Sequence, residues 1–138
     1  MDAGTVGAIL SEFVDTTAWM PRIHSRAQDI AHAARMIDLG RVHVAEQEGA
    51  IVGFYALNGE DMDALYVAAA NRGQGVGAAL LRHAQDAVDR LALWTFQANS
   101  GAQRFYLRQG FAEVQRSDGS NSDEKLPDIK YEWQRGAM

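Results

Sequence analysis

In the first third of the chain, apolar residues recur at intervals of three and four, which is the spacing of an amphipathic helix. One such run covers residues 5–15. A second begins after Ser25, where Gln28 completes the pattern of a capping box, and Gly40 suits the position just past a helix end. The N-terminal part therefore predicts two helices, with a break at the Trp-Met-Pro sequence of residues 19–21.

The pattern then changes to the alternation and short apolar runs of β-strands. We expect strands over residues 41–47, 51–57 and 62–67, with Asn58-Gly59 as a hairpin turn. Residues 51–57 are apolar on both faces, which is typical of a central strand. Later in the chain, the pattern predicts further strands at residues 91–97, 111–116 and 128–133.

A glycine-rich stretch, Asn-Arg-Gly-Gln-Gly-Val-Gly-Ala at residues 71–78, leads from the third strand into another amphipathic helix. Apolar residues follow at helical spacing: Val76, Leu80, Ala84, Val88 and Leu91. Glycine lets the backbone turn sharply and approach a ligand closely, and free N–H groups at a helix start bind anions. With Arg72 as a fixed positive charge, the stretch predicts a phosphate site. The alternative is a plain glycine-rich turn before a surface helix.

Strand, glycine loop, helix and strand in this order make a βαβ unit, so strands 62–67 and 91–97 should be parallel. The hairpins before them should be antiparallel. Asn99 or Ser100 can cap a short helix that ends at Gly110. We therefore expect a single α+β domain over residues 1–138.

Composition narrows the functional classes. The 138 residues suffice for one domain with a core. The absence of cysteine excludes disulfides, thiolate metal sites and a cysteine nucleophile. A net charge of −5 argues against nonspecific nucleic-acid binding. No apolar run has the length of a membrane span, and no secretory signal is visible, so we expect a cytoplasmic protein that binds neither nucleic acid nor membrane.

Two common phosphate-binding motifs fit poorly. A dinucleotide fold needs an acidic residue at the end of the strand that follows the helix, but here that strand ends Phe-Gln-Ala-Asn at residues 96–99. A P-loop needs Gly-Lys-Ser or Gly-Lys-Thr after its glycines, and this chain has neither there.

A second motif follows the second parallel strand directly. It consists of Asn99, Ala102, Phe105-Tyr106 and Gly110-Phe111. Together with Arg72-x-x-Gly75-x-Gly77, it resembles the two signature motifs of the GNAT superfamily of N-acetyltransferases. The resemblance extends over most of the chain, to a bacterial type with no assigned substrate. It implies a mixed, mostly antiparallel central sheet, flanked by helices, with one parallel strand pair splayed around the cofactor.

The resemblance implies acetyl-coenzyme A as the phosphate ligand and acyl donor, and no metal. The implied cofactor-binding residues are Leu65, Tyr66, Val67, Arg72, Gly73, Gln74, Gly75, Val76, Gly77, Ala78, Asn99 and Tyr106. Asn99 is equally suited to cap the helix that follows it. The implied activity is acetyl transfer to a primary amine of a small molecule or peptide, by direct attack in a ternary complex. The alternative is a catalytically inactive module that binds or senses acetyl-coenzyme A.

Two residues are candidates for proton transfer. Tyr106 matches the family position that protonates the departing thiolate, which suits a phenol with a pKa of about 10. Its other interpretation is a core aromatic. Asp63 lies on the strand before the glycine loop, where relatives often place a carboxylate or an ordered water, but it is equally a solvated carboxylate on a strand face. His24, His43 and Glu46 are weaker candidates for the base, and water alone can serve.

The chain departs from the family at its start. Members usually open with a strand before the first helix, but here Asp2-Ala3 stands almost where that strand should end. Without it, residues 41–47 form an open sheet edge, which pairs readily with another chain. We therefore expect a homodimer.

Overall fold

The computed structural model describes residues 2–120 and 124–136. The helices are α1 (Ala3–Thr16), α2 (Arg26–Asp38), α3 (Val76–Ala87) and α4 (Ser100–Arg108), with a short 3-10 turn, η1 (Ala69–Asn71), before α3. The strands are β1 (Val42–Gln47), β2 (Ala50–Asn58), β3 (Asp61–Val67), β4 (Arg90–Phe96), β5 (Ala112–Ser117) and β6 (Asp128–Gln134). Each predicted strand, and each of the two N-terminal helices, is confirmed to within two residues at its ends.

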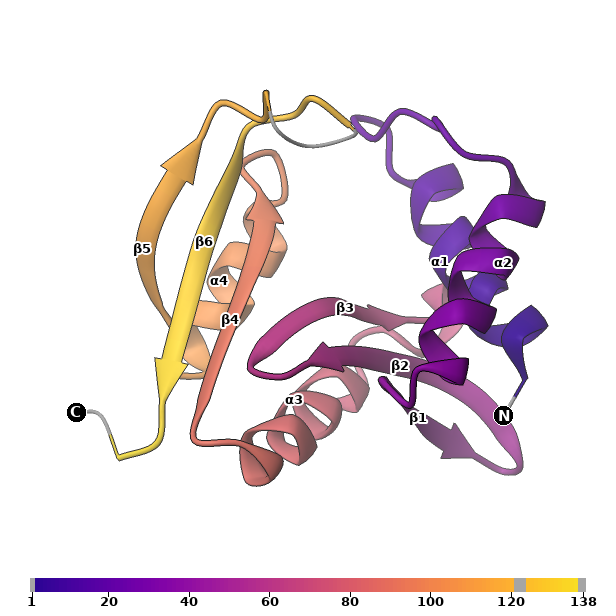
Figure 1. Ribbon diagram of the computed structural model, residues 1–138, viewed down its shortest axis with the longest axis horizontal. Helices are drawn as coiled ribbons and strands as arrows, with labels where there is room; N and C mark the ends of the chain where they lie inside the picture. Colours follow the sequence, from indigo (N-terminus) through magenta and orange to yellow (C-terminus); the bar gives the residue numbers. More distant parts are fainter. Residues whose placement is uncertain (1, 121–123, 137–138) are drawn as a thin grey trace.

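The strands form one sheet in the order β1-β2-β3-β4-β6-β5. All neighbours are antiparallel except β3 and β4, whose parallel pairing has a single register position, Asp61 opposite Ala92. Beyond it the two strands diverge, so the sheet opens into two halves (Figure 1). The expected mixed sheet with one splayed parallel pair is confirmed.

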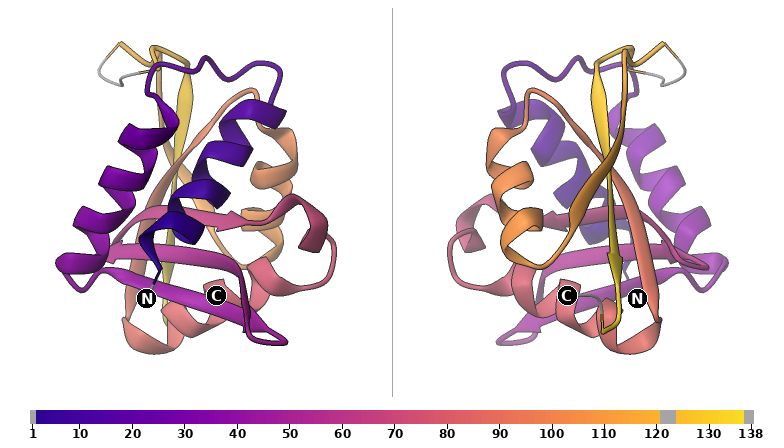
Figure 2. Two further views of the ribbon diagram at one scale, coloured as in Figure 1. Left: turned by 90° about the vertical axis from the view of Figure 1, so that its right-hand side faces the viewer. Right: turned by 90° about the vertical axis from the view of Figure 1, so that its left-hand side faces the viewer.

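The helices cover different parts of this sheet. α1 and α2 lie together on one face of β1–β3, and α3 lies on the other (Figure 1). α4 covers one face of β4, β6 and β5 (Figure 2). The core has accordingly two clusters: one around Phe54 under α1 and α2, the other around Tyr55, Leu81 and Leu91 on the α3 side. The opening between the sheet halves thus has α1 on one side and α4 on the other.

Local sequence signals set several helix ends as expected. The Ser25 hydroxyl accepts from the Gln28 N–H at 3.1 Å, and the Gln28 side chain accepts from the Ser25 N–H at 2.7 Å. Gly40 follows α2 with a φ of +71°, a conformation that glycine adopts without strain. These contacts confirm the predicted capping box and the glycine at the end of the helix.

One predicted element extends too far. α3 ends at Ala87, Val88 is extended, and Leu91 belongs to β4, so the expected helical face through Val88 and Leu91 is wrong. Both residues still pack on the core cluster that α3 covers. Their spacing is helical because helix and strand face the same core, not because the helix continues.

At the edge of the sheet, β1 pairs with β2 alone, and no strand precedes α1 in the described part of the chain. Within the described ranges, one edge of β1 is therefore open. None of the helices in the described ranges is long and apolar enough to cross a membrane.

Candidate active site

A cavity of about 610 Å³ fills the opening between β3 and β4. α4 and the glycine stretch border it on one side, and Phe13 of α1 on the other. Most of the predicted site residues line it: Asp63, Leu65, Tyr66, Val67, Arg72, Gly73, Gly75, Val76, Gly77, Asn99 and Tyr106. Gln74 and Ala78 do not. The divergence of the two strands thus gathers in one place residues that are far apart in sequence.

The glycine stretch gives this cavity an end suited to anions. Gly73 and Gly75 have φ values of +77° and +83°, and a Cβ added to either would meet nothing within 4 Å. Gly75 is the N-cap of α3, and no side chain caps this helix, whereas Asp2, Ser25 and Asn99 cap the other three α-helices. The first turn of α3 also contains no acidic residue. The N–H groups of this first turn, with the positive end of the helix dipole, therefore remain available to a phosphate. We call this site, from Gly73 to the first turn of α3, the anion cradle.

Arg72 and Asn99 also line the cavity, and their side chains make different contacts. The Arg72 Nε donates to the carbonyl of Val67 at 3.3 Å, which fastens the exposed arginine to the end of β3. The Asn99 Oδ1 accepts from the Ala102 N–H at 3.1 Å, so the helix-capping interpretation of Asn99 is confirmed. Because Asn99 also lines the cavity, capping does not remove it from the site.

Tyr106 projects from α4 into the wall of the cavity. It is only 8% exposed, and its ring lies 5.3 to 6.0 Å from the rings of Phe105, Phe111 and Tyr131, measured between centroids. It is therefore both a core aromatic and a cavity residue. Burial, with a further contribution from Tyr66, raises the pKa of the Tyr106 phenol, which stays protonated at neutral pH.

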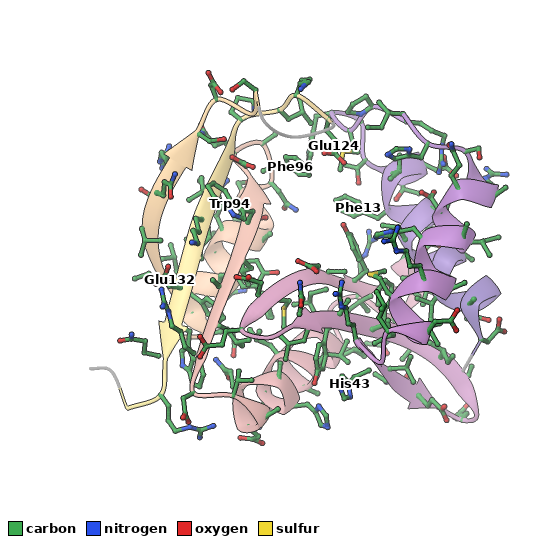
Figure 3. All side chains as sticks on the ribbon, in the orientation of Figure 1. Phe13, His43, Trp94, Phe96, Glu124 and Glu132 are labelled. Atoms are coloured by element: carbon green, nitrogen blue, oxygen red, sulfur yellow. The ribbon has the colours of Figure 1, made fainter. Side chains whose placement is uncertain are left out.

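Aromatic side chains bridge the opening on its α1 side. Phe13 contacts Tyr66 with ring centroids 5.2 Å apart, and Trp19 contacts Phe13 at 6.2 Å and Phe96 at 5.5 Å. Phe13, Phe96 and Glu124 surround the space above β3 (Figure 3). The segment after α1 thus reaches the end of β4 through Trp19, while Phe13 and Phe96, which Trp19 contacts, line the cavity.

A second cavity of about 440 Å³ adjoins the first and shares Asp63, Ala64 and Tyr66 with it. α1, α2 and the loop between them form most of its wall. Its acidic and histidine lining residues are Asp29, Asp63, Glu124, His24 and His32, and no lysine or arginine of the described chain lines it. Its apolar lining includes Leu10, Met20, Ile23 and Met36. A cationic group with an aliphatic stem fits both features.

Asp63 lies where the two cavities meet. Burial is the main cause that raises the pKa of its carboxyl; Asp61 adds to the effect, while Arg41 and His32 oppose it. Tyr66 stands at the same junction, and burial, with the charges of Glu124 and Asp29, raises the pKa of its phenol to about 12. The carboxyl group of Asp63 and the protonated phenol of Tyr66 therefore lie together where the two cavities meet.

The other candidate bases separate into two groups. His24 lines the second cavity, but His43 and Glu46, on β1, line neither cavity. The His43 ring instead stacks on the Tyr55 ring on another part of the sheet, with ring centroids 4.8 Å apart.

The sequence reasoning missed His32, which lines the second cavity and acts on the pKa of Asp63. Its position three residues after Asp29 and four before Met36 puts the three on one helical face. That spacing was the available signal.

Residues 38–113 match the acetyltransferase (GNAT) domain family. Among curated proteins, the chain is 37% identical over 76 residues to the peptidyl-lysine N-acetyltransferase YjaB of Salmonella typhimurium. It is 36% identical over 76 residues to that of Escherichia coli. These matches cover 55% of the chain and 52% of each relative, so the chain spans about half the length of the curated relatives that it matches.

Solved structures resemble the whole fold. The solution structure of apo-form YjaB from Escherichia coli has a TM-score of 0.80 and 26% identity, covering 98% of this chain and 92% of that one. A structure of yncA from Salmonella typhimurium with acetyl-CoA has a TM-score of 0.73 at 20% identity, covering 99% and 90%. The fold around the cavity is therefore shared with both.

Proposed function

The chain belongs to the acetyltransferase (GNAT) domain family, and we propose that it transfers the acetyl group of acetyl-coenzyme A to the side-chain amine of a peptidyl lysine. The observation that carries this proposal is the junction at Asp63 and Tyr66 between a cavity with an anion cradle and a cavity lined by carboxylates. The lysine acceptor is suggested by the names of the relatives and by the chemistry of the second cavity.

The first cavity fits acetyl-coenzyme A. The open N–H groups at the start of α3 and the Arg72 guanidinium would hold its phosphates. The backbone of Leu65 to Val67 faces the cavity on the side where β3 has lost β4 as a partner, so its polar groups are available to the amides of the pantetheine arm. When bound, the donor supplies an activated acetyl thioester.

The second cavity fits the lysine. Its apolar wall suits the four-carbon stem, and Asp63 and Glu124 attract the ammonium group. A carboxylate is a far weaker base than an amine with a pKa of about 10.4. We therefore assign to Asp63 the binding of the ammonium and the transfer of its proton to solvent. Solvent acting alone as the base is the alternative, and replacement of Asp63 separates the two.

We assign to Tyr106 an interaction with the sulfur of the thioester. Its phenol is a weaker acid than a thiol, whose ordinary pKa is about 8.5, so full transfer of its proton is uphill by at least about 2 kcal/mol. Its main role is then to donate a hydrogen bond to the sulfur as negative charge develops there. In the overall reaction the C–N bond forms and the C–S bond breaks. The ammonium loses two protons to solvent through Asp63, and the thiolate, hydrogen-bonded by Tyr106, takes up one proton from solvent to become the thiol.

Calorimetric titration with acetyl-coenzyme A, with NAD as the control ligand, tests the donor cavity. Transfer is then measured as thiol release with a peptide that contains one lysine and a blocked N-terminus, beside a polyamine, an aminoglycoside and a peptide with a free N-terminus. We expect binding of acetyl-coenzyme A alone and transfer to the lysine peptide. Binding without transfer to any amine would favour the sensing module, and no binding would refute both functions.

We also propose that the protein self-associates through the open edge of β1, since an unpaired edge strand is a site for β-pairing. Sedimentation velocity at micromolar concentration should show a dimer. A monomer would contradict this, without bearing on the acetyl transfer.

A further inference from the structure

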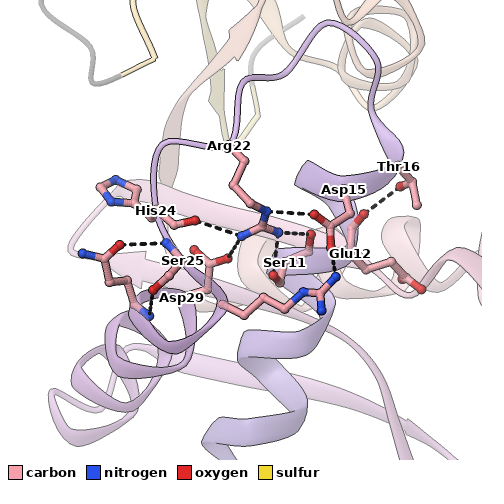
Figure 4. A network of polar contacts seen from close by, with 10 residues as sticks. Ser11, Glu12, Asp15, Thr16, Arg22, His24, Ser25 and Asp29 are labelled. Carbon is pink, nitrogen blue, oxygen red and sulfur yellow. Dashed lines mark hydrogen bonds and ion pairs between the residues drawn. The ribbon is translucent and has the colours of Figure 1, made fainter.

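Residues 17–25 connect α1 to α2, and several of them form a wall of the second cavity. Met20, Pro21, Ile23 and His24 line it, whereas Arg22, in their midst, does not. The Arg22 side chain extends the other way, into the groove between the two helices (Figure 4). The loop therefore presents its apolar side chains to the cavity and anchors itself through one arginine.

The Arg22 guanidinium bonds to acceptors on every segment around it. Its Nε donates to Asp15 Oδ1 at 2.8 Å, and its Nη1 donates to the His24 carbonyl at 2.9 Å and to Asp29 Oδ2 at 3.1 Å. Its Nη2 donates to the carbonyl and the hydroxyl of Ser11, at 2.8 and 2.6 Å. Five acceptors match the five N–H donors of an arginine, so α1, the loop and the start of α2 are joined at one point.

This anchorage is partly buried and specific to arginine. The Arg22 side chain is 29% exposed and that of Asp29 only 9%. A planar guanidinium can serve several acceptors in fixed directions, whereas a lysine offers three donors from a single point. Asp29 also lines the second cavity, so the same contact that holds the loop holds one of the cavity's carboxylates in place.

We propose that Arg22 is a positioning residue for the acceptor: by fixing the loop and Asp29, it holds the wall of the second cavity in the shape that receives the lysine stem. This inference rests on the proposed function. It requires that Arg22 affect the binding of the acceptor and not the binding of the donor, because the first cavity is lined neither by Arg22 nor by residues 20–24.

The test compares Arg22→Lys with a matched control, Arg26→Gln. Arg26 bonds to the same Asp15 at 3.0 Å, but its side chain is 76% exposed, and it holds no part of the loop. For Arg22→Lys we expect the KM for the lysine peptide to rise about tenfold, with kcat and the KM for acetyl-coenzyme A within about twofold of wild type. Amide hydrogen exchange in residues 18–24 should also accelerate. Arg26→Gln should change none of these.

If Arg22→Lys does not fold, Asp15→Asn weakens the same anchorage from its exposed end while leaving the buried Asp29 paired, and it should raise the peptide KM by a smaller factor. An unchanged peptide KM in a folded variant overturns the inference and leaves the proposed function standing. Equal losses for peptide and donor, together with a lower melting temperature, also overturn it, because they indicate a purely structural role. Absence of transfer by the wild type refutes the proposed function, and the inference with it.

Discussion

Replacing Tyr106 by phenylalanine isolates its hydroxyl from its ring. The ring packs with Phe105, Phe111 and Tyr131, and this packing survives the change. Within the described ranges no other residue hydrogen-bonds the hydroxyl, so its removal leaves no buried partner unpaired. We therefore expect the free energy of unfolding to change by less than about 1 kcal/mol. The structure allows the effect on activity to be separated from any effect on folding.

The expected loss of activity follows from the role of the hydroxyl. Positioned proton donors contribute about 10²- to 10⁴-fold to a rate. Because burial raises the pKa of Tyr106 and weakens it as an acid, we expect the lower end, about a 10²-fold fall in kcat, which corresponds to about 2.7 kcal/mol in the activation barrier. The affinity for acetyl-coenzyme A should stay within about twofold, since the phosphate cradle is untouched.

Thiol release with the lysine peptide measures kcat, and calorimetry measures donor affinity. The matched control is Tyr131→Phe: Tyr131 is 2% exposed and belongs to the same aromatic group, but it does not line the cavity. It should retain wild-type turnover. The reasoning is refuted if Tyr106→Phe keeps its turnover, or if both variants lose it equally.

Three further substitutions test other parts of the structure. Gly75→Ala places a Cβ at a residue whose φ is +83°, which should lower the free energy of unfolding by about 1 kcal/mol. It should also weaken acetyl-coenzyme A binding in calorimetry. The control, Gly49→Ala in the β1–β2 turn, where φ is +80°, should lose stability without losing acetyl-coenzyme A affinity. Asp63→Asn should lower kcat/KM for the lysine peptide and spare the KM for acetyl-coenzyme A, whereas Asp61→Asn, outside both cavities, should do less; wild-type values for Asp63→Asn would leave solvent as the base. Burial, and to a lesser extent His83, lowers the pKa of His43, so the unfolded chain takes up this proton more readily than the folded one. Stability in urea should therefore fall as the pH drops below about 6.5, and less so in His43→Gln; equal falls would contradict this.

Some features of the structure follow from short stretches of sequence, because the forces that form them act over a few residues. The capping box at Ser25 and Gln28 and the glycine turn at Gly40 are local hydrogen-bonding and backbone choices. The cradle at Gly73 and Gly75 is of the same kind, since positive φ values and an uncapped helix start need no distant partner. These were readable before any fold was known.

The spacing of apolar residues predicted the end of a helix less well where a helix and the strand after it face the same core. Val88 and Leu91 continue the helical spacing of α3, yet they lie beyond its end. Periodicity records which side of the chain is buried, and a helix and a following strand can bury the same side. The end of the helix was therefore set by packing and not by the pattern.

The sequence by itself determined the elements, their order and the two motifs that place the chain in its family. It left Asp63 undecided between a solvated carboxylate and a catalytic one, indicated His32 only through its helical spacing from Asp29 and Met36, and gave no sign of the contacts of Arg22. Only the tertiary structure puts Asp63 in the wall of a cavity, because the divergence of β3 from β4 and the packing of α2 bring Asp63, His32 and Tyr66 to one junction. Hydrogen-bonding patterns and periodicities are properties of neighbours along the chain. A cavity is formed by segments that are distant along the chain, so the arrangement of its charges and the shifts in its pKa values arise only once those segments have come together.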